Sequence, residues 1–162
     1  MNYCVDQIHR QLLDRGCGTL PQIEVFETIG STNTYLLGLD GVANRVCLAK
    51  RQTAGRGRRG RTWQSRASGS VLMSMGWEFN GQDLSGLSLV CGLASVWALR
   101  EFGLAGVALK WPNDLLVNEK KLAGIQFHAG ARTLHVRPRK VQTVFKWCIH
   151  VQTQSHNTFS TT

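Results

Sequence analysis

An arginine- and glycine-rich run over residues 50–66, KRQTAGRGRRGRTWQSR, is the part of the sequence best suited to do chemistry. It contains six arginines and no acidic residue. Such a cluster cannot be buried unpaired, and guanidinium groups bind carboxylates and phosphates through paired hydrogen bonds. Glycines let the backbone approach a ligand closely. The run predicts a loop that binds nucleic-acid phosphates, with Trp63 stacked on a base, or that folds over a small anionic ligand; a plain basic surface loop is the structural alternative.

Gly55, Gly57 and Gly60 within this run also match the spacing G-x-G-x-x-G. A dinucleotide-binding fingerprint of this form must open a helix. Here residues 61–63 and then a strand follow, and the intervening arginines leave no apolar surface for helix packing. A protein kinase needs further motifs and a much longer chain. The spacing therefore indicates neither class of protein.

Three further short motifs carry polar groups at the ends of predicted strands. Residues 31–33 (Ser-Thr-Asn) follow the first strand, residues 111–114 (Trp-Pro-Asn-Asp) end a later strand, and residues 121–125 (Lys-Leu-Ala-Gly-Ile) return from the hairpin that follows. Taken singly, each has a simple structural explanation: a helix cap, a strand-ending turn and a hairpin lysine in solvent. A functional interpretation depends on their combination with the arginine loop.

The elements that must position these motifs follow from hydrophobic periodicity and capping residues. Helices are predicted around residues 5–12 and 33–36 and over 84–102, strands over 22–29, 46–50, 70–79 and 106–112, a loop over 51–69, and a β-hairpin of 114–117 and 122–127 around a turn at 118–121. Ser31 or Thr32 is the expected cap of the short second helix, and Asp83 and Gly103 are the expected ends of the third. This order predicts the α+β class, a mixed β-sheet with helices on one face.

Length and composition set wider limits. The 162 residues suit one domain, and 43% hydrophobic with 18% charged residues is typical of a globular chain. No run approaches 18 consecutive apolar residues, and the polar N-terminus of mixed charge does not resemble a secretory signal. The five cysteines include no C-x-x-C pair, so we expect no disulfide framework and no zinc or other protein metal site, and we expect a cytoplasmic location.

The net charge of +9 predicts an anionic partner, but the charge is unevenly distributed. Residues 1–125 hold 14 basic and all 10 acidic residues, whereas residues 126–162 hold five basic residues and no acid. More than half of the positive excess therefore lies in the last 37 residues. The net charge of the whole chain therefore says little about the function of residues 1–125.

In this order and around an arginine–glycine loop, the motifs resemble the catalytic domain of biotin protein ligases. The matching stretches, between about residues 22 and 125, are ETIGSTNTYLL, RQTAGRGRRGRTW, SVLMSMGWEF, the helix with LSLVCGLA, KWPNDLLV and KKLAGI. The resemblance implies the biotin/lipoate ligase-like, class II synthetase-like α+β fold. It also implies the activity of a biotin–[acetyl-CoA-carboxylase] ligase: biotin and ATP, with Mg²⁺, form biotinyl-5′-AMP, and the biotinyl group then passes to a lysine of a biotin carboxyl carrier domain.

The resemblance also implies roles for individual residues. It implies a biotin and adenylate site formed by Ser31, Thr32, Asn33, Gln52, Arg56, Gly57, Arg58, Trp63, Asn113 and Lys121. The first four would supply donors and acceptors for the biotin ureido ring, and Trp63 would pack near the adenine. Lys121, Arg58 and Asp114 would be catalytic, with Lys121 near the carboxylate and the α-phosphate, and Asp114 orienting or deprotonating the acceptor lysine. Phosphate oxygens would hold most of the Mg²⁺ coordination.

The family pattern ends near Ile125. Family members continue with an acid-containing apolar strand, a G-x-G-x-N segment and a small C-terminal barrel, and some begin with a helix-turn-helix domain; we expect none of these here. We interpret residues 1–125 as the N-terminal part of the catalytic domain and residues 126–162 as a divergent basic tail from a frameshifted or terminated gene. Such a chain is expected to transfer biotin slowly or not at all. The alternative is a genuine tail in which residues 141–153 form a strand.

Two other functions stay open. A lipoate or octanoate ligase or transferase has a related fold, and a nucleic-acid-binding module would use the arginine loop and the basic tail, with binding that depends steeply on salt. For the leading hypothesis the expected partner is the carrier domain, with a homodimer as an open alternative; neither specific DNA binding nor membrane association is expected. Competition between biotin and lipoate would separate the two ligase hypotheses.

Overall fold

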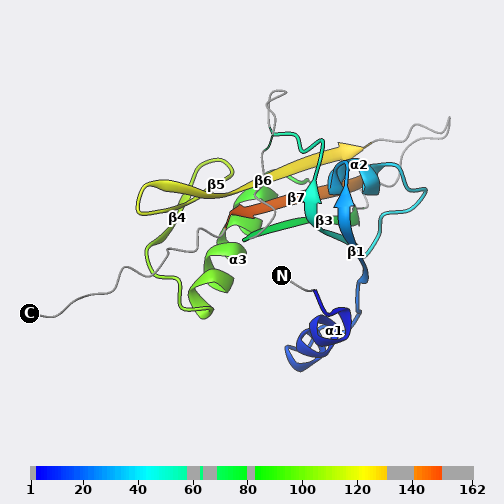
Figure 1. The fold of residues 1–162 in the computed structure, drawn as a ribbon, viewed down its shortest axis with the longest axis horizontal. Coiled ribbons are helices and arrows are strands. Elements are labelled where there is room, and N and C mark those ends of the chain that lie inside the picture. Colours follow the sequence, from blue (N-terminus) through cyan, green and yellow to red (C-terminus); the bar gives the residue numbers. More distant parts are fainter. Residues whose placement is uncertain (1–2, 58–62, 64–68, 80–82, 131–140, 151–162) are drawn as a thin grey trace, which may run out of the picture.

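The computed structural model describes residues 3–57, 63, 69–79, 83–130 and 141–150. Its elements are α1 (Val5–Asp14), β1 (Gln22–Ile29), α2 (Thr32–Leu37), β2 (Arg45–Gln52), β3 (Ser70–Phe79), α3 (Leu87–Glu101), β4 (Val107–Lys110), β5 (Asp114–Val117), β6 (Lys120–Gly130) and β7 (Val141–His150). Figure 1 shows a twisted sheet with α3 against it and α1 at the edge of the molecule. The strands predicted over 22–29 and 70–79 have the predicted bounds.

The seven described strands form one sheet in the order β1-β2-β3-β7-β6-β5-β4. β1 and β2 are parallel, and the other neighbouring strands are antiparallel, which confirms the predicted mixed sheet. β7 lies between β3 and β6, so the strand considered for residues 141–153 is present over residues 141–150, in the middle of the sheet, and its last three residues lie outside the described ones. The domain boundary at residue 125 stays a prediction, while β6 continues to Gly130.

The helices pack on both faces of the sheet rather than on the single face that the sequence predicts. Val71 of β3 packs against a cluster that includes Val96 of α3. Leu72 points to the opposite face, because side chains alternate along a strand. There it contacts Phe26, which also packs against the cluster of Leu36 on α2. The α+β class is therefore confirmed, with α3 on the Val71 face and α2 on the Leu72 face.

The long helix α3 begins three residues later than predicted. Its N-cap is Gly86, in the left-handed conformation with φ 84°, rather than Asp83. The carboxylate of Asp83 accepts the N–H of Ser85 at 2.8 Å, so it holds the turn before the helix. Gly103, with φ 81°, follows the end of the helix as predicted. Neither α3 nor any other helix within the described residues is long and apolar enough to cross a membrane.

The hairpin turn between β5 and β6 is shorter than the predicted turn at 118–121. Only Asn118 and Glu119 lie between the strands, with φ angles of 48° and 62°. Two successive residues with positive φ make the tight turn that matches the twist of a two-stranded hairpin. Lys120 and Lys121 therefore belong to β6, and the position of Lys121 is set by strand geometry rather than by a loop.

The more buried side of β3 carries small and polar residues. Its deeply buried positions are Ser70, Leu72, Ser74 and Gly76. The large side chains that alternate with them are less buried, and Trp77 is 46% exposed. Close packing explains the small residues, since a Cβ at Gly76 would lie 2.2 Å from the carbonyl oxygen of Val42. The α2 face of β3 thus provides a floor on which polar side chains can meet.

Candidate ligand-binding site

The first turn of α2 buries three consecutive polar residues. Ser31 is the N-cap, as predicted, and its Oγ accepts the N–H of Thr34 at 3.4 Å. Ser31, Thr32 and Asn33 are each less than a tenth exposed. Buried polar groups in folded proteins almost always have hydrogen-bond partners. This turn therefore needs partners from the sheet or from a ligand.

Thr32 connects α2 to two strands. Its N–H donates to Oε1 of Gln52 at 2.9 Å, and its hydroxyl donates to the same oxygen at 3.2 Å. Because that hydroxyl has a single proton, the 2.8 Å contact between Thr32 Oγ1 and Ser74 Oγ is one in which Ser74 donates. Ser74 is fully buried and is absent from the predicted site residues. The strand over 70–79 also contains Ser70 and Glu78, so its sequence carries no signal that would single out Ser74.

Two buried amide atoms of this first polar group, on Asn33 and Gln52, have no partner among the residues that the structure describes. Oδ1 of Asn33 and Nε2 of Gln52 are buried and make no hydrogen bond with any residue that the structure describes. The Asn33 atom is an acceptor, and the Gln52 atom is a donor whose amide is oriented by Thr32 through Oε1. An unpaired buried donor or acceptor costs about 1–3 kcal/mol. The two atoms therefore predict a ligand that offers both an N–H and a carbonyl.

A second polar group lies where β5 begins and β6 returns. Nζ of Lys121 lies 2.8 Å from Oδ1 of Asp114, and Nδ2 of Asn113 donates to the same oxygen at 3.1 Å. Nζ of Lys121 also lies 5.3 Å from the ring centroid of Trp63, within the range of a cation–π contact. These contacts hold the ammonium in place. Because the Lys121 side chain is 45% exposed, the ammonium is still accessible to an anion.

Gly55 and Trp63 connect the two polar groups. The N–H of Trp63 donates to the carbonyl of Gly55 at 2.8 Å. A Cβ at Gly55 would lie 2.8 Å from the Trp63 carbonyl oxygen and 3.6 Å from Nε2 of Gln52. A Cβ at Gly124 would lie 3.4 Å from the Trp63 ring and 3.5 Å from Cε of Lys121. Glycine at these two positions lets the indole pack between the Gln52 side and the Lys121 side of the site.

The structure thus brings most of the predicted site residues into two adjoining groups. The first group contains Ser31, Thr32, Asn33 and Gln52, and the second contains Trp63, Asn113, Asp114 and Lys121. Arg56 and Gly57 follow Gly55 directly, with Arg56 exposed and Gly57 half-buried, while Arg58 lies outside the described residues. Within the described part of the chain, no three His, Cys, Asp or Glu side chains are grouped as metal ligands. The roles of these residues stay predictions.

The chain is similar to known ligases in sequence and in structure. It is 40% identical over 132 residues to the bifunctional ligase/repressor BirA of Salmonella typhimurium and 41% identical over 128 residues to the biotin–[acetyl-CoA-carboxylase] ligase of Mycobacterium tuberculosis. These matches cover 79% and 71% of this chain but 39% and 47% of the relatives, so the chain spans less than half of their length.

Structural similarity extends over most of the chain. The biotin protein ligase of Leishmania major in complex with biotinyl-5-AMP matches with a TM-score of 0.69 and 26% identity, over 85% of this chain and 60% of that one. The model of the biotin/lipoate A/B protein ligase family matches residues 25–136, which is more than half of the 162 residues and includes both polar groups of the site. The chain therefore belongs to the biotin/lipoate A/B protein ligase family.

Proposed function

We propose that the site binds biotin, and that a full-length version of the protein joins biotin to ATP and transfers the biotinyl group to a carrier protein. The observation that carries the proposal is that, within the described part of the chain, a buried acceptor of Asn33 and a buried donor of Gln52 are both unpaired. A cyclic urea offers an N–H and a carbonyl on neighbouring atoms, which complements these two atoms. The ureido ring of biotin would satisfy both side chains within a mostly buried slot.

The same two atoms favour biotin over lipoate. The dithiolane ring of lipoate has neither an N–H nor a carbonyl, so it would leave both amide atoms unpaired at about 1–3 kcal/mol each. A site with buried hydrogen-bonding groups rejects a ligand that lacks the matching groups. The relatives support this choice, since the Mycobacterium tuberculosis protein is named a biotin ligase and the Leishmania major structure contains biotinyl-5-AMP.

Lys121 serves the first step, adenylation, in this proposal. An oxygen of the biotin carboxylate attacks the α-phosphorus of ATP and pyrophosphate leaves, so negative charge gathers where two anions meet. The ammonium of Lys121 is held 2.8 Å from Asp114 and beside the Trp63 ring. A fixed cation at this place stabilises the developing charge, and a compact ammonium can follow that charge as it moves.

Asp114 and the arginine loop serve the second step. The ε-amine of a carrier lysine attacks the biotinyl carbonyl, AMP leaves, and the amine loses a proton. The Asp114 carboxylate already binds the ammonium of Lys121, so it can orient an incoming lysine amine or accept its proton. Arg56, Gly57 and Arg58 would keep the adenylate away from water until the carrier arrives. The partner is thus a biotin carboxyl carrier domain, and the proposed location is the cytoplasm.

ATP would bring Mg²⁺ to this site. In the second polar group the described residues provide one carboxylate, Asp114, and Lys121 binds it. This arrangement fits a metal ion held mainly by phosphate oxygens and water. Trp63 packs against Ala49 and Leu72, so its indole is partly buried and is held where it could contact adenine. A base of RNA or DNA stacked on a surface tryptophan fits this packing less well.

Calorimetric titration of the chain with biotin and with lipoate tests the proposal. We expect biotin to bind and lipoate to compete poorly. Asn33→Ala or Gln52→Ala should weaken biotin binding by about tenfold or more, since each leaves a ureido group unpaired. Thr34→Ala is the matched control, because Thr34 is exposed on the same helix. Equal binding of lipoate, or full biotin affinity in both amide variants, would show that the two amides do not recognise the ureido ring.

A further inference from the structure

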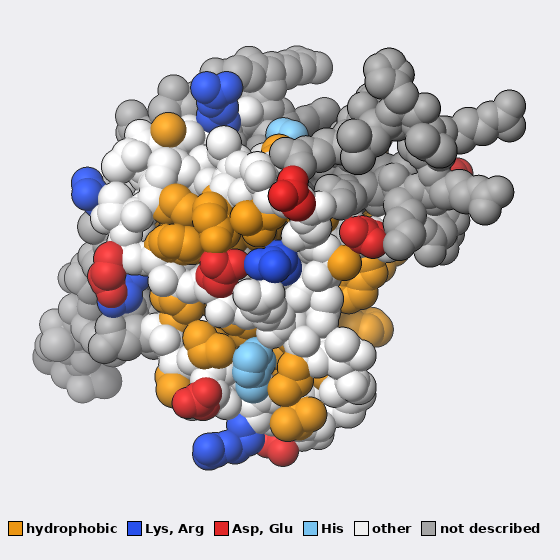
Figure 2. Space-filling model, turned by 90° about the vertical axis from the view of Figure 1, so that its right-hand side faces the viewer, with side chains coloured by type: hydrophobic (Ala, Val, Ile, Leu, Met, Phe, Trp, Pro, Cys, Tyr) orange, Lys and Arg blue, Asp and Glu red, His pale blue; other side chains and the backbone are white. Residues whose placement is uncertain are grey.

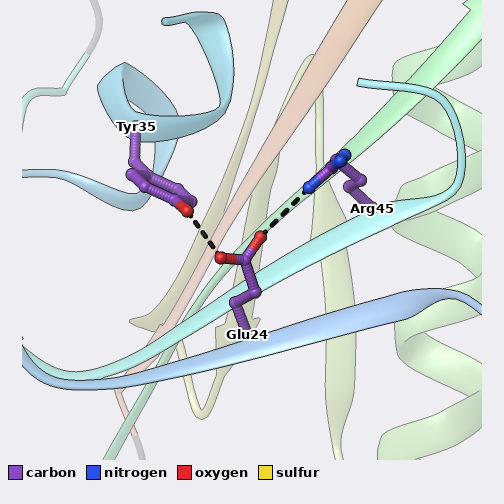
Figure 3. Close-up of polar contacts among 3 residues, drawn as sticks. All are labelled: Glu24, Tyr35 and Arg45. Atoms are coloured by element: carbon purple, nitrogen blue, oxygen red, sulfur yellow. Dashed lines mark hydrogen bonds and ion pairs between the residues drawn. The ribbon is translucent and has the colours of Figure 1, made fainter. Parts of the chain in front are cut away.

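Glu24 of β1 connects α2 to the sheet outside both polar groups of the site. Its Oε2 accepts the hydroxyl of Tyr35 at 2.5 Å, and its Oε1 lies 3.4 Å from Nη1 of Arg45 on β2. Figure 3 shows the Glu24 carboxylate between the two side chains, one on α2 and one on β2. A hydroxyl bound to a carboxylate at this length is among the strong hydrogen bonds in proteins.

The orientation of α2 depends on such contacts. The helix has six residues, which are too few for stability in isolation. Leu36 is buried against Val42 and Cys47, and the ring of Tyr35 packs edge-on against Phe26 with centroids 4.9 Å apart. Apolar contacts of this kind are not directional. They hold α2 on the sheet, whereas its rotation depends on directional contacts: the hydrogen bonds of Thr32 with Gln52 and Ser74 at its start, and that of Tyr35 with Glu24 further along.

Helix geometry places the side chains of Tyr35 and Asn33 on opposite flanks of α2. Successive residues are turned by about 100° around the axis, so Thr32 and Leu36 face the sheet together. Tyr35 and Asn33 then lie on opposite flanks of that line. A rotation that carries Tyr35 away from Glu24 therefore also moves the amide of Asn33.

We infer that Glu24 is a positioning residue: its hydrogen bond with Tyr35, together with the bonds of Thr32 to the sheet, sets the rotation of α2 and so directs the Asn33 amide toward the ureido ring. The inference rests on the proposed function and adds a residue that touches neither the ligand nor the reacting atoms. The hydrogen bond to Glu24, and then burial, raise the pKa of Tyr35, so its hydroxyl remains a donor at neutral and moderately alkaline pH.

Arg45 holds the Glu24 carboxylate from its other side. Figure 2 shows the face at the right-hand side of Figure 1, on which acidic and basic side chains lie among apolar ones. The side chains of Arg45 and Glu24 are 31% and 28% exposed, so water screens their ion pair. Such a pair adds little stability by itself. Its contribution here is to the direction of the carboxylate.

Biotin titration of four variants tests the inference. Tyr35→Phe keeps the ring against Phe26 and removes only the hydroxyl, and we expect a biotin Kd about three- to tenfold higher. Glu24→Ala should have the same effect, whereas Glu24→Gln keeps an acceptor for the hydroxyl and should stay within about twofold. Glu27→Gln is the matched control, because Glu27 lies on the same strand and its partner is Lys50 of β2, at 2.6 Å.

A double-mutant cycle with Asn33→Ala separates positioning from a loss of stability. If Glu24 acts through Asn33, Tyr35→Phe has little further effect on biotin affinity once the Asn33 amide is absent. Additive losses in the double variant would overturn the inference. So would a Tyr35→Phe variant with a lower melting temperature and unchanged biotin affinity, since that result describes a purely structural contact.

Hydrogen exchange of the α2 amides distinguishes a failure of this inference from a failure of the proposed function. If the unchanged chain does not bind biotin, the proposed function is wrong. The positioning of α2 by Glu24 then stands only if Tyr35→Phe speeds exchange over residues 32–37 relative to Glu27→Gln. Equal exchange in these two variants overturns the positioning role, whatever the ligand.

Discussion

Lys121 and Asp114 lie on the same face of the β5–β6 hairpin, with 2.8 Å between Nζ and Oδ1, because β6 contains one extra residue. The register shifts between Leu115 and Leu116, so that Leu122 is left between two pairs. Regular alternation would point Lys121 to the face that α3 covers. The bulge turns it to the opposite face, on which α2 packs. Bulges are common beside active sites.

Lys121→Ala should nearly abolish adenylate formation in a full-length version of the protein. The charge of Lys121 is needed most where negative charge gathers in the transition state, so we expect a loss of about 10²–10³ in rate. Biotin binding should weaken much less. Exchange of labelled pyrophosphate into ATP measures the first quantity, and calorimetry measures the second.

Lys120→Ala is the control for that experiment, because Lys120 is the exposed neighbour of Lys121 on the same strand. It should leave adenylation unchanged. Loss of biotin binding and of adenylation in equal measure in Lys121→Ala would assign Lys121 to binding alone.

Arg58→Ala should make a full-length version release biotinyl-5′-AMP early. Removing a charge-assisted contact costs about 1.5–3 kcal/mol, which appears mainly as a faster dissociation rate. Rapid dilution of the labelled intermediate measures that rate. Arg51→Ala is the control, since Arg51 donates to Thr28 of β1 at 3.2 Å, outside the loop tip. An unchanged dissociation rate in Arg58→Ala would mean that the loop does not clamp the adenylate.

Gly55→Ala should disturb the junction of the two polar groups. The new Cβ would lie 2.8 Å from the backbone oxygen of Trp63. That oxygen belongs to the backbone that is hydrogen-bonded to Gly55, so it cannot move away as a flexible side chain could. Overpacking of this kind costs about 1–3 kcal/mol, and biotin affinity should fall with it. Gly41→Ala is the control, because nothing lies within 4 Å of a Cβ there. Urea unfolding and titration of both variants decide the matter; equal behaviour would show that the Trp63 contact is easily displaced.

Stability should fall as the pH rises above about 9, and Cys47 is one cause. Burial, and then the nearby Glu24 charge, raise the pKa of the Cys47 thiol from its ordinary value of 9.0 to about 12. Between these values the unfolded chain releases a proton that the folded chain retains, so the free energy of unfolding decreases by at most about 1.4 kcal/mol per pH unit. Urea unfolding between pH 8 and about 11 gives the free energy of unfolding as a function of pH. In Cys47→Ala this free energy should fall less steeply with pH, by an amount that corresponds to nearly one proton. Cys4→Ala is the control, because Cys4 is exposed. Equal slopes in all three proteins would contradict the assignment.

The local part of the fold could be predicted from the sequence. Alternation defined the strand over 70–79, and Ser31 defined the start of α2. The start of α3 was predicted wrongly because Asp83 does not cap the helix. Its carboxylate accepts the N–H of Ser85 in the preceding turn, and the helix begins after Gly86. Alternation on β3 did not reveal which side is the more buried: Ser74 and Gly76 are buried, while Trp77 is 46% exposed. The approach of Val42 to the sheet is a tertiary contact that no local pattern encodes.

The site was predictable as a set of motifs but not as an arrangement. The motifs supplied both polar groups, since Thr32 meets Gln52 and Asp114 meets Lys121. Ser74 could not be singled out, because one hydroxyl in a strand has many ordinary explanations. The bulge at Leu122 was equally hidden, since register depends on which strands pair, and the pairing of β6 with β7 is a long-range contact.

The place of β7 gives the folding of this chain an order. Strands β1–β3 and β4–β6 are each formed from neighbouring stretches of sequence, and β7, the last described strand, joins them. The first polar group belongs to one half-sheet and Lys121 to the other. Long-range strand pairing is slow compared with local pairing, so we expect both halves to form before β7 inserts. Until then β3 and β6 present open edges that invite association with other chains. The two polar groups of the proposed site are thus brought together at the same step that closes the open strand edges.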